Sequence, residues 1–312
     1  MKNQTMCLLA CAFAAFTITS CNQDLESPQP TDGRHAHLRI EPTISGRIDT
    51  RAEKNAWARG DVLGIFICTQ DDKIDSPYLG KDSYSNVEYT YSGSLWDATR
   101  ETNLGVDAGN VYAYYPYVSD ADPTAIPVKV EGQTDYLYGK ADTLVNYQQK
   151  VATIRMKHAM TQFSLQLTLG EYEGDGYVSS IKIRNSASAG HLVSSGTLNI
   201  QSGKIQGGEP TDLTVWTADS VSVKGNKLTV SQILVPTGST QNEGDIRLEV
   251  TIDGKVFYYD FKAGTDWKAG YRNIYRSSIN SNALVIDPEN GIIIEPWKDN
   301  SENAQVELIP VS

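Results

Sequence analysis

The stretch Ile246-Arg247-Leu248-Glu249-Val250-Thr251-Ile252-Asp253-Gly254-Lys255-Val256-Phe257-Tyr258-Tyr259-Asp260-Phe261 decides the fold class. Apolar and polar residues alternate over 246–252, which is the pattern of a strand with one buried face. An Asp-Gly pair separates this run from a second, mostly apolar run at 256–261. Because Asp-Gly suits the positive φ angles of a two-residue hairpin turn, the stretch predicts a β-hairpin.

The same two-residue period recurs along the chain from about His37 onward. Further strands are expected at Leu38–Ile44, Val62–Cys68, Val111–Tyr117, Phe163–Leu169, Leu228–Val230 and Ile233–Val235. The run at 62–68 is apolar at both phases, as in a strand buried on two faces. Long helical periodicity is missing from the sequence, and glycine, serine, asparagine and proline clusters recur at short intervals. We therefore expect an all-β sandwich architecture.

The length of the chain suggests two domains, since one hydrophobic core rarely serves about 290 residues. The segment 142–150 is polar, and a strand-like run starts at Val151. The expected organisation is an N-terminal sandwich domain at 37–150 and a C-terminal one at 151–312. A weak internal echo between Trp57-Ala58-Arg59-Gly60 and Trp267-Lys268-Ala269-Gly270 fits two similar domains, although chance explains it about as well.

The N-terminus has the features of an export signal. Lys2 precedes an apolar run, Met6–Ile18, which at about 13 residues is too short to cross a bilayer. The residues Ile18-Thr19-Ser20-Cys21 resemble a bacterial lipobox, in which the cysteine thiol carries the lipid. We expect a lipoprotein signal peptide at 1–20, lipid on Cys21 and a polar, proline-bearing tether at 21–36. The alternative is an ordinary signal peptide with a chance cysteine.

Charge and cysteine content narrow the function classes. The formal net charge of −11 argues against nucleic acid and anionic headgroups as partners. Of the four cysteines, Cys7 and Cys11 leave with the signal and Cys21 is the lipid site, so Cys68 would be the one left and no intramolecular disulfide is expected. The apolar neighbours of Cys68 predict a buried thiol rather than a nucleophile.

No group of residues predicts catalysis, a metal site or a cofactor. His35 and His37 lack acidic or cysteine partners, and His158 is predicted to be structural. Asp71, Asp72 and Asp75 do not match the spacing of a calcium loop, nor do Asp120 and Asp122, and we interpret them as solvated carboxylates. Glu171, Glu173 and Asp175 fall in a glycine-rich turn, which is a poor place for a glycosidase pair. The chain has no Gly-x-Ser-x-Gly elbow. We expect a protein that is not an enzyme.

Aromatic residues leave one binding alternative open. The chain has 17 tyrosines and five tryptophans, most densely at Tyr112, Tyr114, Tyr115 and Tyr117. These rings could stack on sugars, which would make the chain a monomeric, lipid-anchored glycan-binding protein. Tyrosine is also a common strand residue, apolar in its ring and polar at its hydroxyl, and we favour that interpretation.

Several segments resemble motifs of the fimbrillin-like proteins of anaerobic gut and oral bacteria, in the same order along the chain. They are Trp57-Ala58-Arg59-Gly60-Asp61-Val62-Leu63-Gly64-Ile65-Phe66, Val111–Tyr117, Leu137–Ala141, Lys157–Phe163, Trp267–Tyr275, and Ile292–Ile294 with Trp297. The resemblance covers about residues 38–300. It implies two tandem transthyretin-like β-sandwiches and a pilus (fimbria) subunit, structural or adhesive, exported as a lipoprotein to the outer membrane surface.

The resemblance also implies a mode of assembly. In several such proteins an arginine-specific protease removes the first strand, and a strand of the next subunit fills the groove. On this chain the cleavage candidates are Arg51 and then Arg47, with Leu38–Ile44 as the strand removed; Arg59 lies inside the tryptophan motif and is disfavoured. The donor strand would be the C-terminal run 304–311, with Val306 and Leu308 on one face. The implied partners are other pilin subunits, the outer membrane through Cys21, and a ligand on a host or bacterial surface.

Overall fold

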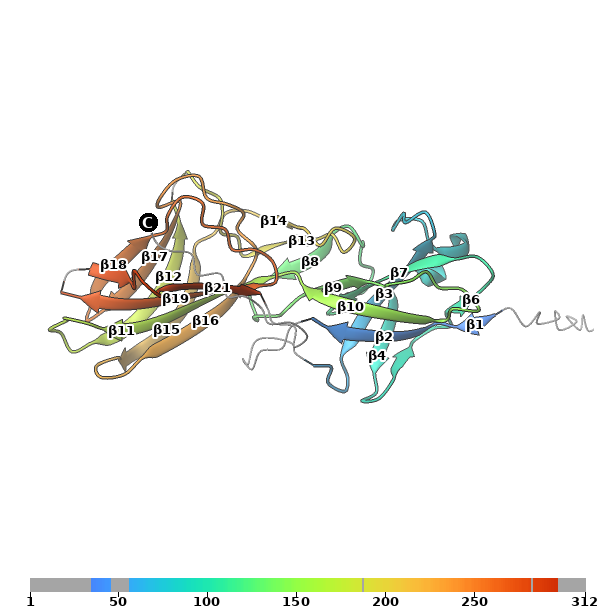
Figure 1. The fold of residues 1–312 in the computed structure, drawn as a ribbon, viewed down its shortest axis with the longest axis horizontal. Coiled ribbons are helices and arrows are strands. Elements are labelled where there is room, and N and C mark those ends of the chain that lie inside the picture. The colour runs from blue at the N-terminus through green and yellow to red at the C-terminus, as the bar shows by residue number, and fades with distance from the viewer. Residues whose placement is uncertain (1–34, 46–55, 187, 282, 297–312) are drawn as a thin grey trace, which may run out of the picture. The chain divides into compact units, whose positions relative to one another are not determined.

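The computed structural model describes residues 35–45, 56–186, 188–281 and 283–296. The described residues form strands β1 to β21 and two short 3-10 helices, at Tyr78–Gly80 and Asp82–Tyr84, and contain no α-helix. The expectation of an all-β protein is therefore confirmed (Figure 1). Among the described residues, no helix is long and apolar enough to span a membrane.

The first half is built on a seven-stranded sheet. Its order is β2 (Arg39–Ile44), β10 (Val151–His158), β9 (Leu137–Lys140), β7 (Gly109–Tyr115), β3 (Val62–Thr69), β4 (Val87–Tyr91) and β5 (Trp96–Ala98). β2 and β10 run parallel, and the other neighbours are antiparallel. A short ribbon pairs β1 (Ala36–His37) with β6 (Asn103–Leu104). Figure 1 shows β2 lying along β10 at one side of this sheet.

β3 is buried on both faces, as the apolar pattern at 62–68 predicted, and so is β7. Their alternate residues enter two different clusters. Leu63 and Ile65 join a core with Ile40 and Ile154. Phe66 joins a second cluster, on the side of β8 (Ile126–Lys129) and β13 (Ser195–Leu198). These two strands form a small sheet with β14 (Ile205–Gly207).

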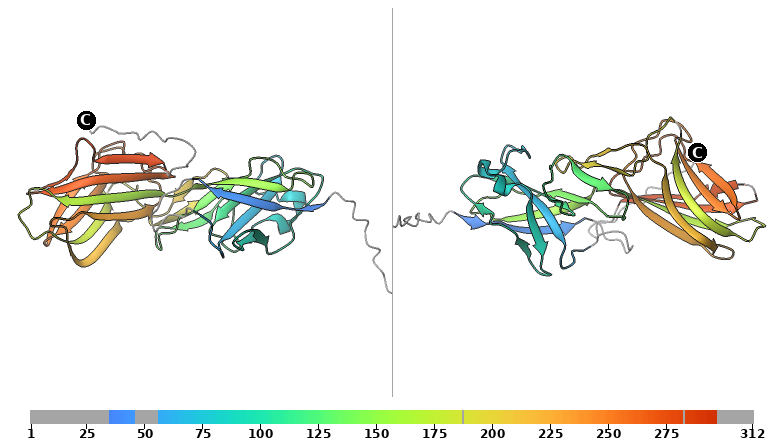
Figure 2. Two further views of the ribbon diagram at one scale, coloured as in Figure 1. Left: turned by 60° about the horizontal axis from the view of Figure 1, so that its bottom comes forward. Right: turned by 180° about the vertical axis from the view of Figure 1, so that it is seen from behind.

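The second half contains two larger sheets. One has the order β16 (Leu228–Leu234), β11 (Thr161–Leu169), β19 (Tyr271–Asn280) and β20 (Ala283–Ile286), and β21 (Ile292–Pro296) also pairs with β19. The other has the order β15 (Leu213–Ser222), β12 (Tyr177–Asn185), β17 (Ile246–Ile252) and β18 (Lys255–Asp260). Leu165 of the first sheet and Ile181 and Val250 of the second are fully buried in one cluster. The two layers are visible in Figure 2.

Aromatic rings fill one part of the core between these sheets. Phe163 of β11 stacks on Tyr275 of β19 at 5.5 Å between ring centroids. Phe261 meets the same Tyr275 edge to face at 4.9 Å, and Trp267 donates its indole N–H to the Tyr275 hydroxyl at 2.7 Å. Trp267 and Tyr275 therefore act as core residues of the fold, with their polar atoms paired.

The predicted hairpin is confirmed. β17 and β18 pair antiparallel from Arg247 opposite Asp260 to Ile252 opposite Lys255. Asp253 and Gly254 form the turn with φ values of 47° and 74°, the left-handed region that this turn requires. The runs at 228–230 and 233–235 instead merge into one strand, β16, which ends at Leu234, because Ser231 and Gln232 continue the pairing with β11.

The expected domain boundary falls at the start of β10. That strand pairs with β2 and β9, which precede it in the sequence, and the next strand, β11, joins the sheet of the second half. Residues 195–198 of β13 pair with β8 of the first half. Strands that follow residue 150 in the sequence, β10 and β13, thus form main-chain hydrogen bonds with strands that precede it. Residues from Arg34 onward cluster as one unit.

Candidate functional site

The candidate site is the strand position that β2 occupies at the end of the seven-stranded sheet. β2 pairs with β10 in register from Arg39 opposite Val151 to Ile44 opposite Met156. Main-chain bonds of 2.9 Å from Arg39 N to Lys150 O and 2.8 Å from Ser45 N to Met156 O mark the two ends of this pairing. In the order of the described strands, β2 is terminal, so its outer edge has no strand partner there.

One face of β2 contributes to the core. Leu38, just before the strand, is 5% exposed and Ile40 is 2% exposed, whereas Arg39 and Glu41 point outward and pair with each other at 2.7 Å. Ile40 packs in the same cluster as Ala152 and Ile154 of β10. Burying an aliphatic side chain of this size contributes about 1.5–3 kcal/mol. Removal of β2 would therefore open an apolar groove along β10.

The outer edge of β2 is closed to a further strand. Arg39 and Ser45 direct their N–H groups at β10, so the alternation of a strand turns the peptide groups of Pro42 away from β10. Proline has no N–H to offer there. Its carbonyl accepts a hydrogen bond from Trp57 Nε1 at 2.8 Å. Pro42 and Trp57 together remove both the donor and the acceptor that would recruit another strand at this point.

Aromatic contacts hold Trp57 in this position. Its ring meets Trp96 of β5 edge to face at 5.1 Å and Tyr115 of β7 at 5.8 Å. Tyr91 of β4 packs on Trp96 at 5.1 Å. The sheet therefore curls until its two outermost strands, β2 and β5, approach each other, with Trp57 between them.

A buried imidazole and a buried carboxyl group lie in contact at the C-terminal end of β2. His158 is the last residue of β10, and its Nδ1 lies 2.7 Å from Asp135 Oδ2, with the two side chains 4% and 1% exposed. His158 Nε2 donates to the main-chain carbonyl of Ser45 at 2.7 Å. A structural histidine was predicted here, and the ring is indeed buried, but its contact with the end of β2 was not foreseen.

The residues singled out for processing and assembly are not placed by the structure. Cys21, Arg47, Arg51, Val306 and Leu308 all lie outside the described residues. The closest described residues are Ser45, the last before the segment 46–55, and Pro296, the end of β21. Lipidation, cleavage and strand donation therefore stay predictions. Arg59, the disfavoured cleavage candidate, is exposed.

The described residues contain no group of three or more histidine, cysteine or acidic side chains that could hold a metal ion. Asp71 accepts a hydrogen bond from the Thr69 hydroxyl and pairs with Lys73, and Asp72 pairs with Lys140 at 2.8 Å. Cys68 is 1% exposed, and burial raises the pKa of its thiol to about 11. A thiol that stays protonated at neutral pH is a poor nucleophile.

The tyrosines proposed as a sugar platform are mostly interior. Tyr112 and Tyr114 are 1% and 0% exposed, in the cluster that β8 and β13 help to form. The Tyr112 hydroxyl donates to Asp72 Oδ1 at 2.6 Å, and the Tyr114 hydroxyl donates to Asn86 Oδ1 at 2.8 Å. A ring without an exposed face cannot stack on a sugar. Tyr112 and Tyr114 are therefore residues of the fold.

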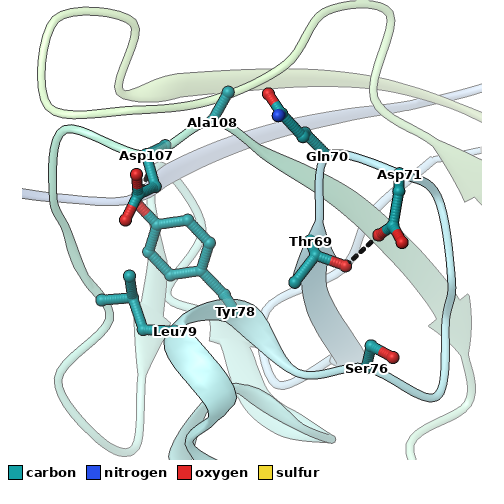
Figure 3. Close-up of a pocket in the computed structure, with 8 residues that line it drawn as sticks. All are labelled: Thr69, Gln70, Asp71, Ser76, Tyr78, Leu79, Asp107 and Ala108. Atoms are coloured by element: carbon teal, nitrogen blue, oxygen red, sulfur yellow. Dashed lines mark hydrogen bonds between the residues drawn. The ribbon is translucent and has the colours of Figure 1, made fainter.

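A hollow of about 550 Å³ lies beside β3 and the first 3-10 helix, and Figure 3 shows the residues that line it. Its aromatic wall, Tyr78, uses its hydroxyl within the fold. The hydroxyl donates to Asp107 O at 2.6 Å and accepts from Gly105 N at 3.0 Å. Asp71 is engaged by Thr69, as the dashed line shows. We find no side-chain arrangement in this hollow that indicates a reaction.

Sequence reasoning missed the residues that secure β2. Asp135 carries no local signal, because its partner His158 is distant in the sequence and meets it only through the pairing of β9 with β10. A signal did exist at Pro42, since proline inside a strand pattern indicates an edge strand. The partner of the Pro42 carbonyl, Trp57, was recognised as a motif residue but not as a contact of β2.

Comparison with known proteins agrees with this architecture. A model of the fimbrillin-like family matches residues 50–297. A protein of Bacteroides uniformis named as fimbrium subunit Fim1C is 25% identical over 311 residues, which cover 95% of this chain and 96% of that protein. Among solved structures, a protein of Bacteroides ovatus described as a cell adhesion protein superposes with a TM-score of 0.61 at 18% identity, covering 84% of this chain and 98% of that one. A fimbrial protein of Bacteroides vulgatus gives 0.54 at 13% identity, covering 84% and 99%.

The fold and the site define a class: an all-β protein whose distinctive feature is an edge-strand position rather than a catalytic cleft. The family match extends over most of the chain, from the tryptophan motif to the end of β21. The chain belongs to the fimbrillin-like family. This is a structural, non-enzymatic family, which confirms both the predicted resemblance and the expectation that the chain is not an enzyme.

Proposed function

We propose that this chain is a structural or adhesive subunit of a cell-surface fimbria that associates with other pilin subunits. The family match supports this function, and so do a fimbrium subunit and a fimbrial protein among its relatives. The chain would be exported as a lipoprotein, with its signal peptide at 1–20 removed and lipid on Cys21 anchoring it in the outer membrane. Two tandem transthyretin-like sandwiches, with the second beginning near residue 151, would form the body.

Assembly would proceed by protease-triggered strand exchange. The observation that carries this proposal is the position of β2. It is the terminal strand of its sheet, it follows the tether, and it ends at Ile44, one residue before the segment 46–55 that contains Arg47 and Arg51. Cleavage after Arg51 or Arg47 would separate β2 from the rest of the fold. An incoming strand could then pair with β10 and place alternate apolar side chains where Leu38 and Ile40 now lie.

The C-terminal run 304–311 is the proposed donor. Val306 and Leu308 alternate in the way that Leu38 and Ile40 do, so two neighbouring pockets of the groove would receive them. Pro310 lacks a backbone donor and would have to lie at the end of the paired segment.

The test is the intact mass and N-terminal sequence of the protein isolated from the cell surface. A chain that starts at Ala52 or Ile48 and carries no lipid supports cleavage and polymerisation. A chain that starts at lipidated Cys21 would contradict cleavage and leave a membrane-anchored adhesive subunit. The glycan-binding alternative receives no support from Tyr112 and Tyr114, because both rings are buried.

A further inference from the structure

The imidazole of His158 lies between a carboxylate and the main chain of β2. Its two nitrogens lie 2.7 Å from Asp135 Oδ2 and 2.7 Å from Ser45 O. Ser45 O is a carbonyl oxygen and can only accept, so His158 Nε2 must carry a proton. Asp135 is compatible with this state in two ways. It can accept from a protonated Nδ1, or its own carboxyl proton can be donated to Nδ1. In both arrangements Nε2–H points at Ser45.

The contact between His158 and Ser45 lies where the pairing of β2 with β10 ends. Ser45 follows the last residue of β2, and its N–H bonds Met156 O at 2.8 Å, so the chain is gripped through both its N–H and its carbonyl at this residue. His158 belongs to β10 and Asp135 to the segment before β9, and neither belongs to β2. The grip therefore belongs to the groove and would remain if β2 left.

From this geometry we propose that His158, oriented by Asp135, is a latch that holds the C-terminal end of whichever strand occupies the β2 position. His158 is a positioning residue. Its Nε2–H binds a main-chain carbonyl, which every residue type offers, so the latch selects for a strand in register with β10 and not for a side chain. In the chain as described the occupant is its own β2. The extension to a strand of a second subunit rests on the proposed function.

Burial gives the latch its strength. Both side chains are almost completely enclosed, and a buried donor that loses its acceptor costs more than an exposed one. A strand that slips by one residue would place an N–H, or no group, where Ser45 O now lies, because carbonyls alternate in direction along a strand. The latch therefore favours the register in which a main-chain carbonyl faces His158 Nε2, and it disfavours a strand that is shifted or that ends before this position.

The second half of the chain offers a matched control. His191 Nδ1 lies 3.2 Å from Thr237 O, and its Nε2 lies 3.6 Å from Asp245 Oδ2. This is the same order of carboxylate, imidazole and carbonyl, at a place without contact to β2. His191→Phe therefore removes a comparable arrangement and reports what such a loss does to stability in general.

The experiment is amide hydrogen exchange of the full chain, read separately for residues 39–45 and for β3 and β7. In His158→Phe we expect exchange of the 39–45 amides to accelerate about tenfold relative to the β3 and β7 amides, the size expected for one buried hydrogen bond. His191→Phe should leave that ratio unchanged. Asp135→Asn should also keep it within about threefold, because an asparagine amide can donate to Nδ1 and leave Nε2–H in place.

Three outcomes would overturn the latch. The 39–45 amides could be unaffected in His158→Phe. They could accelerate together with β3 and β7, which would indicate a general loss of stability. They could also accelerate as strongly in Asp135→Asn, in which case the charge, and not the donated N–H, holds the strand.

A second arm tests the incoming strand. Chains trimmed by an arginine-specific protease are offered a peptide of residues 303–312, and its dissociation rate is measured. We expect the peptide to leave trimmed His158→Phe about tenfold faster than the trimmed wild type. Equal rates would overturn the extension to a second subunit. If trimmed wild-type chains retain no peptide, that result counts against assembly by strand exchange. Whether His158 holds β2 would still be decided by the amide hydrogen exchange of residues 39–45.

Discussion

Among the strands that the structure describes, two pairs run parallel, and they differ in their place in the sheet. β2 and β10 form one, and β11 and β19 form the other. In both pairs the partners lie far apart in sequence. β11 is central, because β16 pairs with its other side, and β19 is bordered by β20 and β21. β2 is terminal and has side chains where a second strand would be.

This difference shows why similar strands can have different fates. β2 and β11 both contribute alternating apolar residues to a core, and each pairs in parallel with one neighbouring strand. On the outer edge of β2 the Pro42 carbonyl is bound by a side-chain donor, Trp57 Nε1, and on the β10 side His158 Nε2 binds the carbonyl of Ser45 just after the strand. A central strand cannot leave without breaking two rows of main-chain bonds, whereas β2 is paired through one row, with side-chain contacts at Pro42 and Ser45.

The largest expected effect is on the global free energy of unfolding, when a buried side chain is shortened in β11 and, for comparison, in β2. Leu165→Ala in β11 removes a fully buried side chain and should lower the global free energy of unfolding by about 2–5 kcal/mol. Ile40→Ala in β2 should lower the global free energy of unfolding less. When β2 is detached, the side chain of residue 40 has already left the core, so the substitution does not alter the stability of that state. Urea unfolding measures the global term, and hydrogen exchange of residues 39–45 measures local opening. Equal global losses without added local opening of β2 would contradict the comparison.

A smaller effect is expected from opening the outer edge of β2. Pro42→Val restores an N–H on that edge, and Trp57→Phe frees the Pro42 carbonyl at a cost of about 0.5–1.5 kcal/mol. The double variant should self-associate through this edge, seen as concentration-dependent sedimentation at neutral pH. Leu95→Val, at an exposed residue between β4 and β5, is the control and should stay monomeric. A double variant that remains monomeric would mean that Pro42 and Trp57 do not block lateral pairing.

Acid should act on the second half through Asp245. Hydrogen bonds from the Asn242 and Gln241 main-chain N–H groups, opposed in part by burial and aided by His191, hold the pKa of Asp245 below its ordinary value of 3.8. A lowered folded-state pKa means that the stabilisation is complete above about pH 4 and is lost as the pH falls through the folded-state pKa. Asp245→Asn should therefore flatten the decline of stability between about pH 4 and pH 2.

Thermal unfolding across this range provides the measurement, with Asp97→Asn on the exposed part of β5 as the control. If Asp245→Asn and Asp97→Asn change the dependence of thermal stability on pH in the same way, the hydrogen bonds to Asp245 are not the cause of the loss of stability in acid. Exchange of residues 39–45 should not depend on Asp245, since this carboxylate has no contact with β2 among the interactions described.

The smallest effect concerns a side-chain contact inside the central pair. Thr168 Oγ1 donates to Ser277 O at 3.1 Å, so it binds a main-chain carbonyl as His158 does. Thr168→Val should cost about 0.5–1.5 kcal/mol of global stability and should not raise local exchange in β11, because β16 and β19 still hold the strand. Thr168→Ser, which keeps the hydroxyl, is the control. A local increase in β11 would show that central strands also open one at a time.

Much of the all-β character follows from local sequence. The alternation at 246–252 and the Asp-Gly turn predicted β17 and β18 correctly, because a hairpin depends on neighbouring residues and on the φ angles of its turn. The doubly apolar run at 62–68 predicted a strand buried on both faces, and β3 has that environment. The order of the tryptophan and tyrosine motifs indicated the fimbrillin-like family, which the family match confirms.

Tertiary structure alone decided where each strand lies and which side chains meet. No local pattern states that residues 39–44 pair in parallel with residues 151–156, because parallel partners are joined by long connections and can be chosen only by the whole fold. The burial of Tyr112 and Tyr114 depends on β13, which arrives from the second half of the chain to pair with β8. The contact of His158 with Asp135 and Ser45 arises in the same way. Sequence determined the period, the turns and the family. The sheet order placed β2 at an edge, and the proposed replacement of that strand depends on this long-range outcome.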